Sequence, residues 1–292
     1  MTTNNETMNS NTMASDQMTN NSETNSHNSH TFGMSDMQEE RSDYPTFHIN
    51  PALLRVGTRE TVPQRIVLVR HGRTSYNRLL RFQGVTDIPL DEHGLWQARM
   101  TGKALRKRYV DMKADGHQPH QLVVASDLSR ARQTAQAFAD PLGLTVHLDE
   151  RLEERDFGEW EGVPFAEAEK KWPKAWASMA EGRGGELRHG FESVEYAGAR
   201  AETAITHWAQ QCGLDTTLFV FFHGSVLSIV VQQLIGLGYD GEAMAISGMH
   251  NAFWAVLRPS FVGDNHFMWN LASYNEGPVE AADLAAWDDL PR

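Results

Sequence analysis

Short apolar runs that end in polar or glycine-containing turns recur along the chain from about residue 49 onward. Such runs predict buried strands, and longer stretches with apolar residues three or four positions apart predict amphipathic helices. We expect strands at 66–69, 122–125, 144–148, 218–222, 253–257 and 266–269. We expect helices at 94–109, 130–139, 192–211 and 225–236.

The alternation of these elements predicts the fold class. Strands that alternate with helices form a mainly parallel sheet with helices packed on its faces. We therefore expect an α/β protein, a three-layer sandwich whose mostly parallel central sheet carries helices on both faces. The chain has no internal repeat that would indicate a solenoid or a propeller.

Composition divides the chain into three segments. Residues 1–45 are rich in Asn, Ser, Thr and Met and poor in large aliphatic residues, which predicts a disordered tail. Residues 46–275 carry the predicted strands and helices and form the expected domain. Residues 276–292 are acidic with a few apolar positions, and this end either packs as a short helix or hangs free.

Charge and cysteine content limit the functional classes. The formal net charge of −12 argues against nucleic acid or an anionic membrane as partner, although an anion pocket can be locally basic. The single cysteine, Cys212, cannot form an intramolecular disulfide, and its apolar surroundings indicate a buried structural role. No apolar run approaches the roughly 18 residues of a membrane span. We expect no secretory signal, because the N-terminus lacks a basic region followed by an apolar core. We expect a cytoplasmic protein, and a homodimer is one assembly that the sequence leaves open.

Two histidines follow predicted strands in the same way. His71 lies in Arg70-His71-Gly72 directly after the apolar run 66–69, and His223-Gly224 follows the run 218–222. The carboxyl ends of strands are where open α/β sheets bind their ligands. Arginine suits phosphate oxygens, and a histidine there either binds phosphate or attacks phosphorus. By contrast, His93-Gly94 and His189-Gly190 lack a preceding strand, and we expect them in loops without chemistry.

Two further segments fit a phosphate site. Arg130 follows a predicted strand end and enters a helix, where free N–H groups already favour anions. The segment 151–162 combines carboxylates with aromatic residues and two glycines. Most carboxylates in such a run are solvated, but one held against aromatic surface could have a raised pKa and act as a general acid.

Five segments in order resemble the histidine phosphatase superfamily, the phosphoglycerate-mutase-like fold, and the resemblance covers residues 65–258. They are Leu-Val-Arg-His-Gly-Arg-Thr-Ser-Tyr-Asn (68–77), Ser-Asp-Leu-Ser-Arg-Ala (126–131), Glu-Arg-Asp-Phe-Gly-Glu-Trp-Glu-Gly (154–162), Phe-Glu-Ser (191–193) and Phe-His-Gly-Ser (222–225). Arg-His-Gly alone is a weak signal, whereas all five at these separations are a specific one. Phe191 and Ser225 depart from the usual residues of the family's motifs.

The resemblance implies roles for individual residues. It implies that His71 is the nucleophile and is transiently phosphorylated, and that Glu154 is the acid and base. Arg70, Arg130 and His223 would bind the phosphoryl oxygens with the help of Asn77. By the same analogy Gln83, Gly84 and Arg155 would lie near the substrate. No metal or other cofactor is required by this chemistry, because charge stabilisation and in-line placement can come from side chains.

The branch of the family is indicated by two features. Mutases of the family resemble one another in having Glu-Ser directly after Arg-His-Gly, whereas this chain has Arg73-Thr74 there. In addition, only about seventy residues separate Glu154 from His223. Both favour a metal-independent phosphatase that acts on a small phosphorylated metabolite. The alternatives are a cofactor-dependent phosphoglycerate mutase and an inactive binding or regulatory member. Residues 163–190 form the expected small cap, in which Trp172, Trp176 and Met179 either contact substrate or pack.

Overall fold

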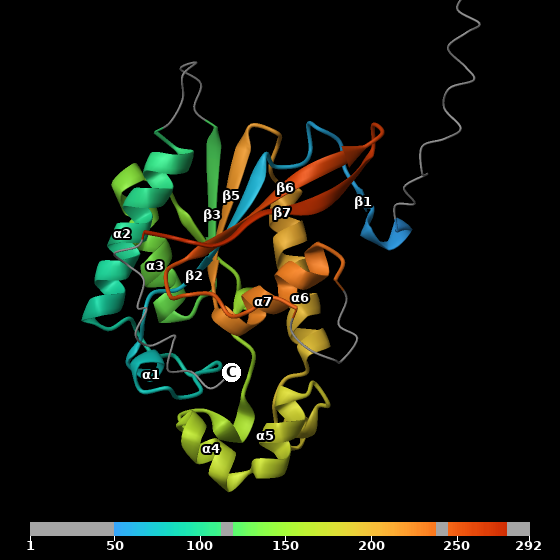
Figure 1. The fold of residues 1–292 in the computed structure, drawn as a ribbon. Coiled ribbons are helices and arrows are strands. Elements are labelled where there is room, and N and C mark those ends of the chain that lie inside the picture. The colour runs from blue at the N-terminus through green and yellow to red at the C-terminus, as the bar shows by residue number, and fades with distance from the viewer. Residues whose placement is uncertain (1–49, 112–118, 238–244, 279–292) are drawn as a thin grey trace, which may run out of the picture. The chain divides into compact units, whose positions relative to one another are not determined.

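A computed structural model describes residues 50–111, 119–237 and 245–278. Seven strands form one sheet with the spatial order β1-β7-β6-β2-β5-β3-β4 (Figure 1). The strands are β1 (Arg55–Val56), β2 (Arg65–Arg70), β3 (His120–Ala125), β4 (Val146–Leu148), β5 (Thr216–Phe222), β6 (Trp254–Val262) and β7 (His266–Glu276). The helices are α1 (Ser75–Arg78), α2 (Glu92–Tyr109), α3 (Ser129–Ala139), α4 (Phe165–Lys171), α5 (Pro173–Ala180), α6 (Val194–Ala209) and α7 (Gly224–Leu234).

The sheet is mixed, with a parallel centre. Strand β5 pairs in parallel with β2 and β3, and β3 pairs in parallel with β4. The strands β6, β7 and β1 extend the sheet from β2 in antiparallel pairs. The predicted α/β sandwich is thus confirmed, and its antiparallel edge comes from the hairpin of β6 and β7. A hairpin needs no crossover helix, whereas parallel neighbours do.

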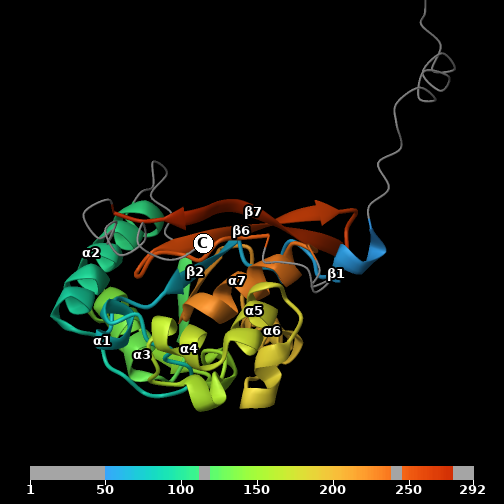
Figure 2. The ribbon, with the colours of Figure 1, turned by 60° about the horizontal axis from the view of Figure 1, so that its bottom comes forward.

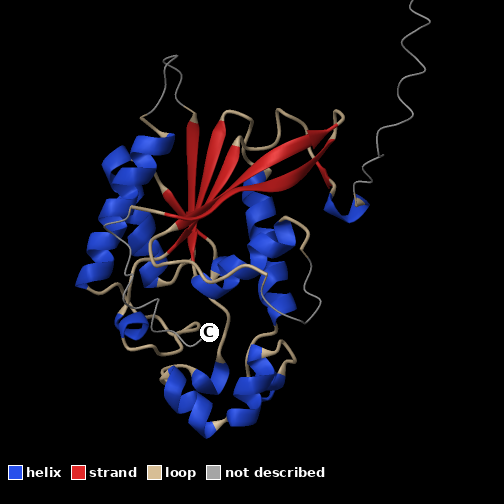
Figure 3. Ribbon diagram, in the orientation of Figure 1, coloured by secondary structure: helices blue, strands red, loops and turns tan. Residues whose placement is uncertain are grey.

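Helices cover both faces of this sheet, as Figures 2 and 3 show. Alternate residues of each strand point to opposite faces. On β5, Leu218, Val220 and Phe222 belong to the core that includes residues of α6 and α7. Phe219 and Phe221 belong to the core with α2 and α3. Burial on both faces explains why the central strands are continuous apolar runs rather than alternating ones.

Side-chain caps set the starts of two helices. The Asp91 carboxylate accepts the Gly94 N–H at 2.8 Å and begins α2 two residues earlier than predicted, so His93 lies in its first turn. The Ser193 hydroxyl accepts the Tyr196 N–H at 3.1 Å and begins α6. Such caps satisfy N–H groups that the helix leaves open. Strand β7 extends to Glu276, beyond the predicted 266–269, and the sequence did not reveal its second half because residues 270–276 do not form a continuous apolar run.

The cap predicted at 163–190 contains α4, α5 and a 3-10 helix, Gly185–His189, and lies beyond the carboxyl ends of the central strands (Figure 1). Its core is aromatic. Trp160 is fully buried and stacks on Trp172, with ring centroids 5.2 Å apart, and on Trp176 at 6.0 Å. Trp172, Trp176 and Met179 all pack in this cluster, which favours the packing role over substrate contact.

The predicted N-terminal tail, residues 1–45, lies outside the described residues. Of the predicted C-terminal tail, Glu276 ends β7, and residues 279–292 lie outside the description. None of the helices in the described ranges combines the length and the apolar character that crossing a bilayer requires.

Candidate active site

The register of two parallel strands brings the two predicted histidines together. Arg70 of β2 is paired with Phe222 of β5, so the next residues, His71 and His223, emerge side by side. The His71 N–H donates to the Phe222 carbonyl at 2.9 Å. The ring centroids of the two histidines are 5.3 Å apart. Both side chains are buried at the carboxyl edge of the sheet.

The His71 ring has a defined tautomer. Its Nδ1 lies 2.7 Å from the carbonyl oxygen of Gly72. A carbonyl only accepts, so Nδ1 carries the proton and Nε2 keeps its lone pair. Burial, followed by the positive charges of Arg130 and Arg70, holds the pKa of His71 well below its ordinary value. The ring is therefore neutral near pH 7, as a nitrogen nucleophile must be.

His223 has the opposite arrangement. Its Nδ1 accepts from Nε of Arg130 at 3.2 Å, and its Nε2 lies 2.9 Å from the Ser126 hydroxyl. Because guanidinium only donates, Nδ1 is unprotonated and Nε2 carries the hydrogen. Burial, and then Arg130, lowers the pKa of His223 well below its ordinary value. The ring is neutral, with its proton directed at Ser126.

Arg130, in the first turn of α3, is completely buried. Its Nη1 donates to the Thr86 carbonyl at 2.9 Å, and its Nη2 donates to the Gly84 carbonyl at 2.7 Å. Glu161 holds the same loop from its other side, since its carboxylate accepts the N–H groups of Val85 and Thr86. Burial lowers the pKa of Arg130 to about 10, so the group stays charged.

Arg70 is tied to the loop before β6. Its Nη1 donates to the Met249 carbonyl. Its Nε is buried and has no hydrogen-bond partner among the described residues. A buried donor without a partner is costly and calls for an acceptor. A β-carbon added to Gly224 would lie 2.9 Å from this Nε, so glycine at the start of α7 leaves room for the guanidinium.

Glu154 is held by backbone N–H groups. Its Oε1 accepts from Arg155 N at 3.0 Å and from Val226 N at 2.9 Å, and its Oε2 accepts from Ser225 N at 3.0 Å. Two of these donors are open N–H groups in the first turn of α7. Glu154 therefore caps the helix that follows His223. The aromatic residues of segment 151–162 predicted apolar surface beside such a carboxylate, and Phe157 does line the same cavity, but the hydrogen bonds of Glu154 come from the main chain.

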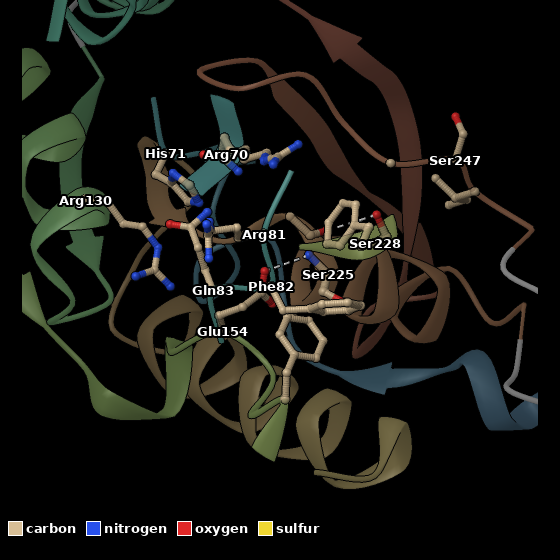
Figure 4. A pocket seen from close by; sticks show the side chains of 16 residues that line it. Arg70, His71, Arg81, Phe82, Gln83, Arg130, Glu154, Ser225, Ser228 and Ser247 are labelled. Atoms are coloured by element: carbon tan, nitrogen blue, oxygen red, sulfur yellow. Dashed lines mark hydrogen bonds between the residues drawn. The ribbon is translucent and has the colours of Figure 1, made fainter. Parts of the chain in front are cut away.

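One cavity of 380 Å³ contains most of the predicted residues (Figure 4). It is lined by Arg70, His71, Asn77, Gln83, Arg130 and Glu154. His223 lies behind this wall, in contact with Arg130. Figure 4 shows Arg70, Arg130 and Glu154 arranged around the space next to His71.

Two predicted substrate-binding residues are not among the residues that line this cavity. The Gly84 carbonyl accepts from Arg130, so Gly84 acts on the site through that side chain. Arg155 is buried, pairs with Glu186 at 3.1 Å and donates to the Glu192 carbonyl at 2.6 Å. Arg155 thus connects the segment of Glu154 to the cap. Both remain predictions as substrate contacts.

The cavity also contains residues to which the sequence assigned no role. Phe157, Gly224 and Ser225 belong to the quoted motifs 154–162 and 222–225, whereas the others were missed: Arg81, Phe82, Phe165, Ser228, Ile246, Ser247 and Gly248. Arg81 and Phe82 directly precede Gln83 in the sequence, which is the one signal that could have found them. Ser228 and residues 246–248 come from a helix and a loop that no motif singled out.

Metal-ligating side chains are not grouped in the part of the chain that the structure describes: no three His, Cys, Asp or Glu residues could together hold an ion. The repeated tripeptide at 188–190 lies in the cap, where His189 Nδ1 is 3.2 Å from a Glu159 oxygen. His189 does not line the cavity that contains His71.

Comparisons with known proteins found similar sequences and structures. A family model described as histidine phosphatase superfamily (branch 1) matches residues 66–270. Glucosyl-3-phosphoglycerate phosphatase of Mycolicibacterium vanbaalenii is 32% identical over 237 residues, which cover 76% of this chain and 98% of the relative. Probable phosphoglycerate mutase GpmB of Yersinia pestis is 32% identical over 181 residues, covering 61% and 78%. A solved mycobacterial glucosyl-3-phosphoglycerate phosphatase complexed with VO3 superposes with a TM-score of 0.61 at 29% identity, covering 73% of this chain and 100% of that one.

Proposed function

The chain belongs to the histidine phosphatase superfamily, and on that premise we propose that it hydrolyses phosphomonoesters without a metal, through a phosphohistidine formed at His71. One observation carries the proposal. The His71 ring is buried and neutral, and the Gly72 carbonyl holds its proton on Nδ1, which leaves the Nε2 lone pair for attack. That nitrogen belongs to a residue that lines a cavity together with Arg70, Arg81 and Arg130.

In the first step Nε2 of His71 attacks phosphorus in line with the leaving oxygen. The P–O bond to the alcohol breaks as the N–P bond forms, and the departing alkoxide takes a proton from Glu154. Arg70 and Arg130 offset the charge on the equatorial oxygens, which is the main task in phosphoryl transfer. A phosphoryl oxygen would also give the buried Nε of Arg70 the acceptor it lacks in the described chain.

In the second step water attacks the phosphohistidine. Glu154, now a carboxylate, accepts a proton from that water. The N–P bond breaks, His71 recovers its lone pair and inorganic phosphate leaves. Splitting hydrolysis in this way replaces one difficult displacement by two easier ones. The backbone N–H groups that hold Glu154 at the start of α7 would keep the carboxylate in one place for both proton transfers.

The substrate that we propose is a small phosphate ester whose alcohol carries hydroxyl groups. Phe82, Phe157 and Phe165 supply apolar surface to the cavity, while Ser225, Ser228 and Ser247 line it as well. A sugar or glycerate group has carbon faces and hydroxyls that suit such a lining. Glucosyl-3-phosphoglycerate, named in the M. vanbaalenii relative, is the first ester to test.

The share of each relative that this chain matches favours a phosphatase over the mutase alternative. The phosphatase relative matches over 98% of its own length and the mutase relative over 78%. An inactive binding protein is disfavoured because His71 and its arginines are all present. The homodimer, the cytoplasmic location and the absence of a nucleic acid or membrane partner remain predictions from the sequence.

The decisive test combines four measurements on the purified protein: activity in EDTA, inhibition by vanadate, kcat of a His71 variant and a rapid quench. Hydrolysis of a sugar phosphate should persist in EDTA and be inhibited by vanadate, which mimics the trigonal-bipyramidal transition state. His71→Ala should lower kcat by at least about 10⁴-fold, as expected for loss of a nucleophile, and a rapid quench should find no phosphoprotein. His189→Ala, which alters the other Arg-His-Gly tripeptide, is the matched control and should stay active.

Three results would contradict the proposal. One is a complete loss of activity in EDTA that a divalent metal restores. Another is quench-trapped phosphate on His223 or His189. The third, with 3-phosphoglycerate and 2,3-bisphosphoglycerate together, is isomerisation much faster than release of inorganic phosphate, which would favour the mutase.

A further inference from the structure

Asn251, in the loop before β6, contacts two residues of the site through one nitrogen. Its Nδ2 donates to the His71 carbonyl at 3.1 Å and to Oδ1 of Asn77 at 3.2 Å. The side chain therefore joins the backbone of the proposed nucleophile to a side chain that lines the cavity. No sequence motif pointed to Asn251.

The oxygen of Asn77 already has other donors. The Thr74 N–H donates to the same Oδ1 at 3.1 Å, and the Thr74 hydroxyl lies 3.1 Å from it. The Thr74 N–H can only donate, and so can the Asn251 NH2, which also donates to the His71 carbonyl. The atom of Asn77 that faces both donors must therefore be an acceptor, its amide oxygen. The planar amide of Asn77 must then direct its own NH2 away from Thr74 and Asn251.

We propose that Asn251 is a positioning residue that orients the Asn77 amide so that its NH2 donates to a phosphoryl oxygen in the cavity. The inference rests on the proposed function, in which Asn77 binds that oxygen. Without Asn251, one of the donors that define the orientation is lost. The reverse orientation would present an oxygen to an anion, which repels it.

The conformation of the loop around Asn251 is held against its backbone preference. The next residue, Ala252, has φ of 62°, in the left-handed region that alanine rarely adopts. Ala252 is fully buried, its N–H donates to the His71 carbonyl at 3.0 Å, and its carbonyl accepts from the Thr101 hydroxyl at 2.6 Å. Strain that neighbouring bonds maintain is typical of functional sites. Here it keeps Asn251 within reach of Asn77.

The test measures binding of inorganic phosphate and vanadate by calorimetry, together with kcat and KM. Asn251→Asp keeps the shape but replaces the donor by an acceptor. We expect phosphate affinity to fall roughly tenfold or more, the usual effect of losing a hydrogen bond to a charged group. In the Asn77→Ala background the same substitution should change affinity by less than about threefold, because contacting residues act non-additively. Asn275→Asp is the matched control. The Asn275 oxygen accepts the His250 N–H, and aspartate keeps an acceptor there, so phosphate binding should not change.

Additive effects in the double variant would overturn the inference, since they would mean that Asn251 acts by charge or stability and not through Asn77. So would an unchanged phosphate affinity of Asn251→Asp. The proposed function fails on a different result, a wild-type protein that binds phosphate but hydrolyses no ester. Melting temperatures of all variants identify any that do not fold, and Asn251→Ser then replaces Asp in the same cycle.

Discussion

At the scale of single residues, one carbonyl decides which nitrogen of His71 is free. The Gly72 oxygen holds the proton on Nδ1, while in His223 the Arg130 guanidinium leaves Nδ1 unprotonated. The two histidines lie at the same edge of the sheet, yet Nε2 is the unprotonated ring nitrogen in His71 and Nδ1 is the unprotonated one in His223. The difference comes from neighbours and not from residue type, and it separates the proposed nucleophile from the residue beside it.

The lowered pKa values of His71 and His223 predict a pH dependence of stability. Both rings stay neutral in the native state below pH 6.5, whereas in the unfolded chain they take up protons near that pH. Their contribution to stability is therefore complete above about pH 6.5 and is lost as the pH falls below it, by up to about 1.4 kcal/mol per pH unit for each ring. Urea unfolding between pH 7.5 and 5 should show this decline. His71→Asn should reduce it, and an equal decline in that variant would contradict the assignment.

Glu154 is the acid that we propose for a poor leaving group. Glu154→Gln should slow hydrolysis of a sugar phosphate by roughly 10²–10⁴-fold, the usual range for general acid catalysis. With p-nitrophenyl phosphate the first step should suffer much less, since that leaving group needs little protonation, and phosphoenzyme should accumulate.

The matched control for Glu154 is Glu153→Gln, because Glu153 does not line the cavity. A glutamine at position 154 places an NH2 opposite one of the N–H donors of the carboxylate, so melting temperature has to be measured alongside kcat. Equal losses with both esters, or a larger loss in the Glu153 variant, would move the role to the neighbour.

At the scale of elements, the cap reaches the cavity directly through Phe165 of α4 and indirectly through Phe82, which packs against the aromatic core of the cap. The Phe82 ring lines the cavity, and its centroid lies 5.3 Å from that of Trp160 in the cap core. Packing of the cap therefore shapes the side of the cavity farther from the sheet. Arg70, Arg130 and the two histidines come instead from strand ends and from the start of α3.

Trp160→Ala should separate these two parts of the site. Removing a fully buried tryptophan should cost about 3–5 kcal/mol of unfolding free energy. We expect KM for a sugar phosphate to rise, while the inhibition constant of inorganic phosphate changes little. Trp208→Ala on α6, where the indole donates to Asp149, is the control: it should lower stability without changing KM. An equal rise of both constants in Trp160→Ala would refute the separation.

At the scale of the whole molecule, the net charge of −12 coexists with a cavity lined by three arginines, Arg70, Arg81 and Arg130. Net charge thus describes the surface as a whole and not the site. The predicted class of enzyme, a phosphoric monoester hydrolase of the histidine phosphatase superfamily, is confirmed by the family match and by the phosphatase relatives.

The N-terminal segment is predicted to be dispensable for the domain. Deleting residues 1–45 should leave kcat and melting temperature nearly unchanged, because a polar segment poor in large aliphatics contributes little burial. Differential scanning calorimetry of the full chain and the truncated protein checks this. A decrease of several degrees in melting temperature would show that the segment packs on the domain.

The family, the α/β class and most elements of the parallel centre could be predicted from the sequence, because motifs and apolar runs are local patterns of residue type and spacing. His71 and Arg130 were found in this way. The fold was needed to show the antiparallel edge, the register that places Arg70 opposite Phe222, and the hydrogen bonds that select each tautomer. It also showed that Glu154 caps α7 and that Asn251 contacts Asn77. These contacts join residues far apart in the chain, and pairing over such distances is set by packing of the complete fold rather than by any local pattern.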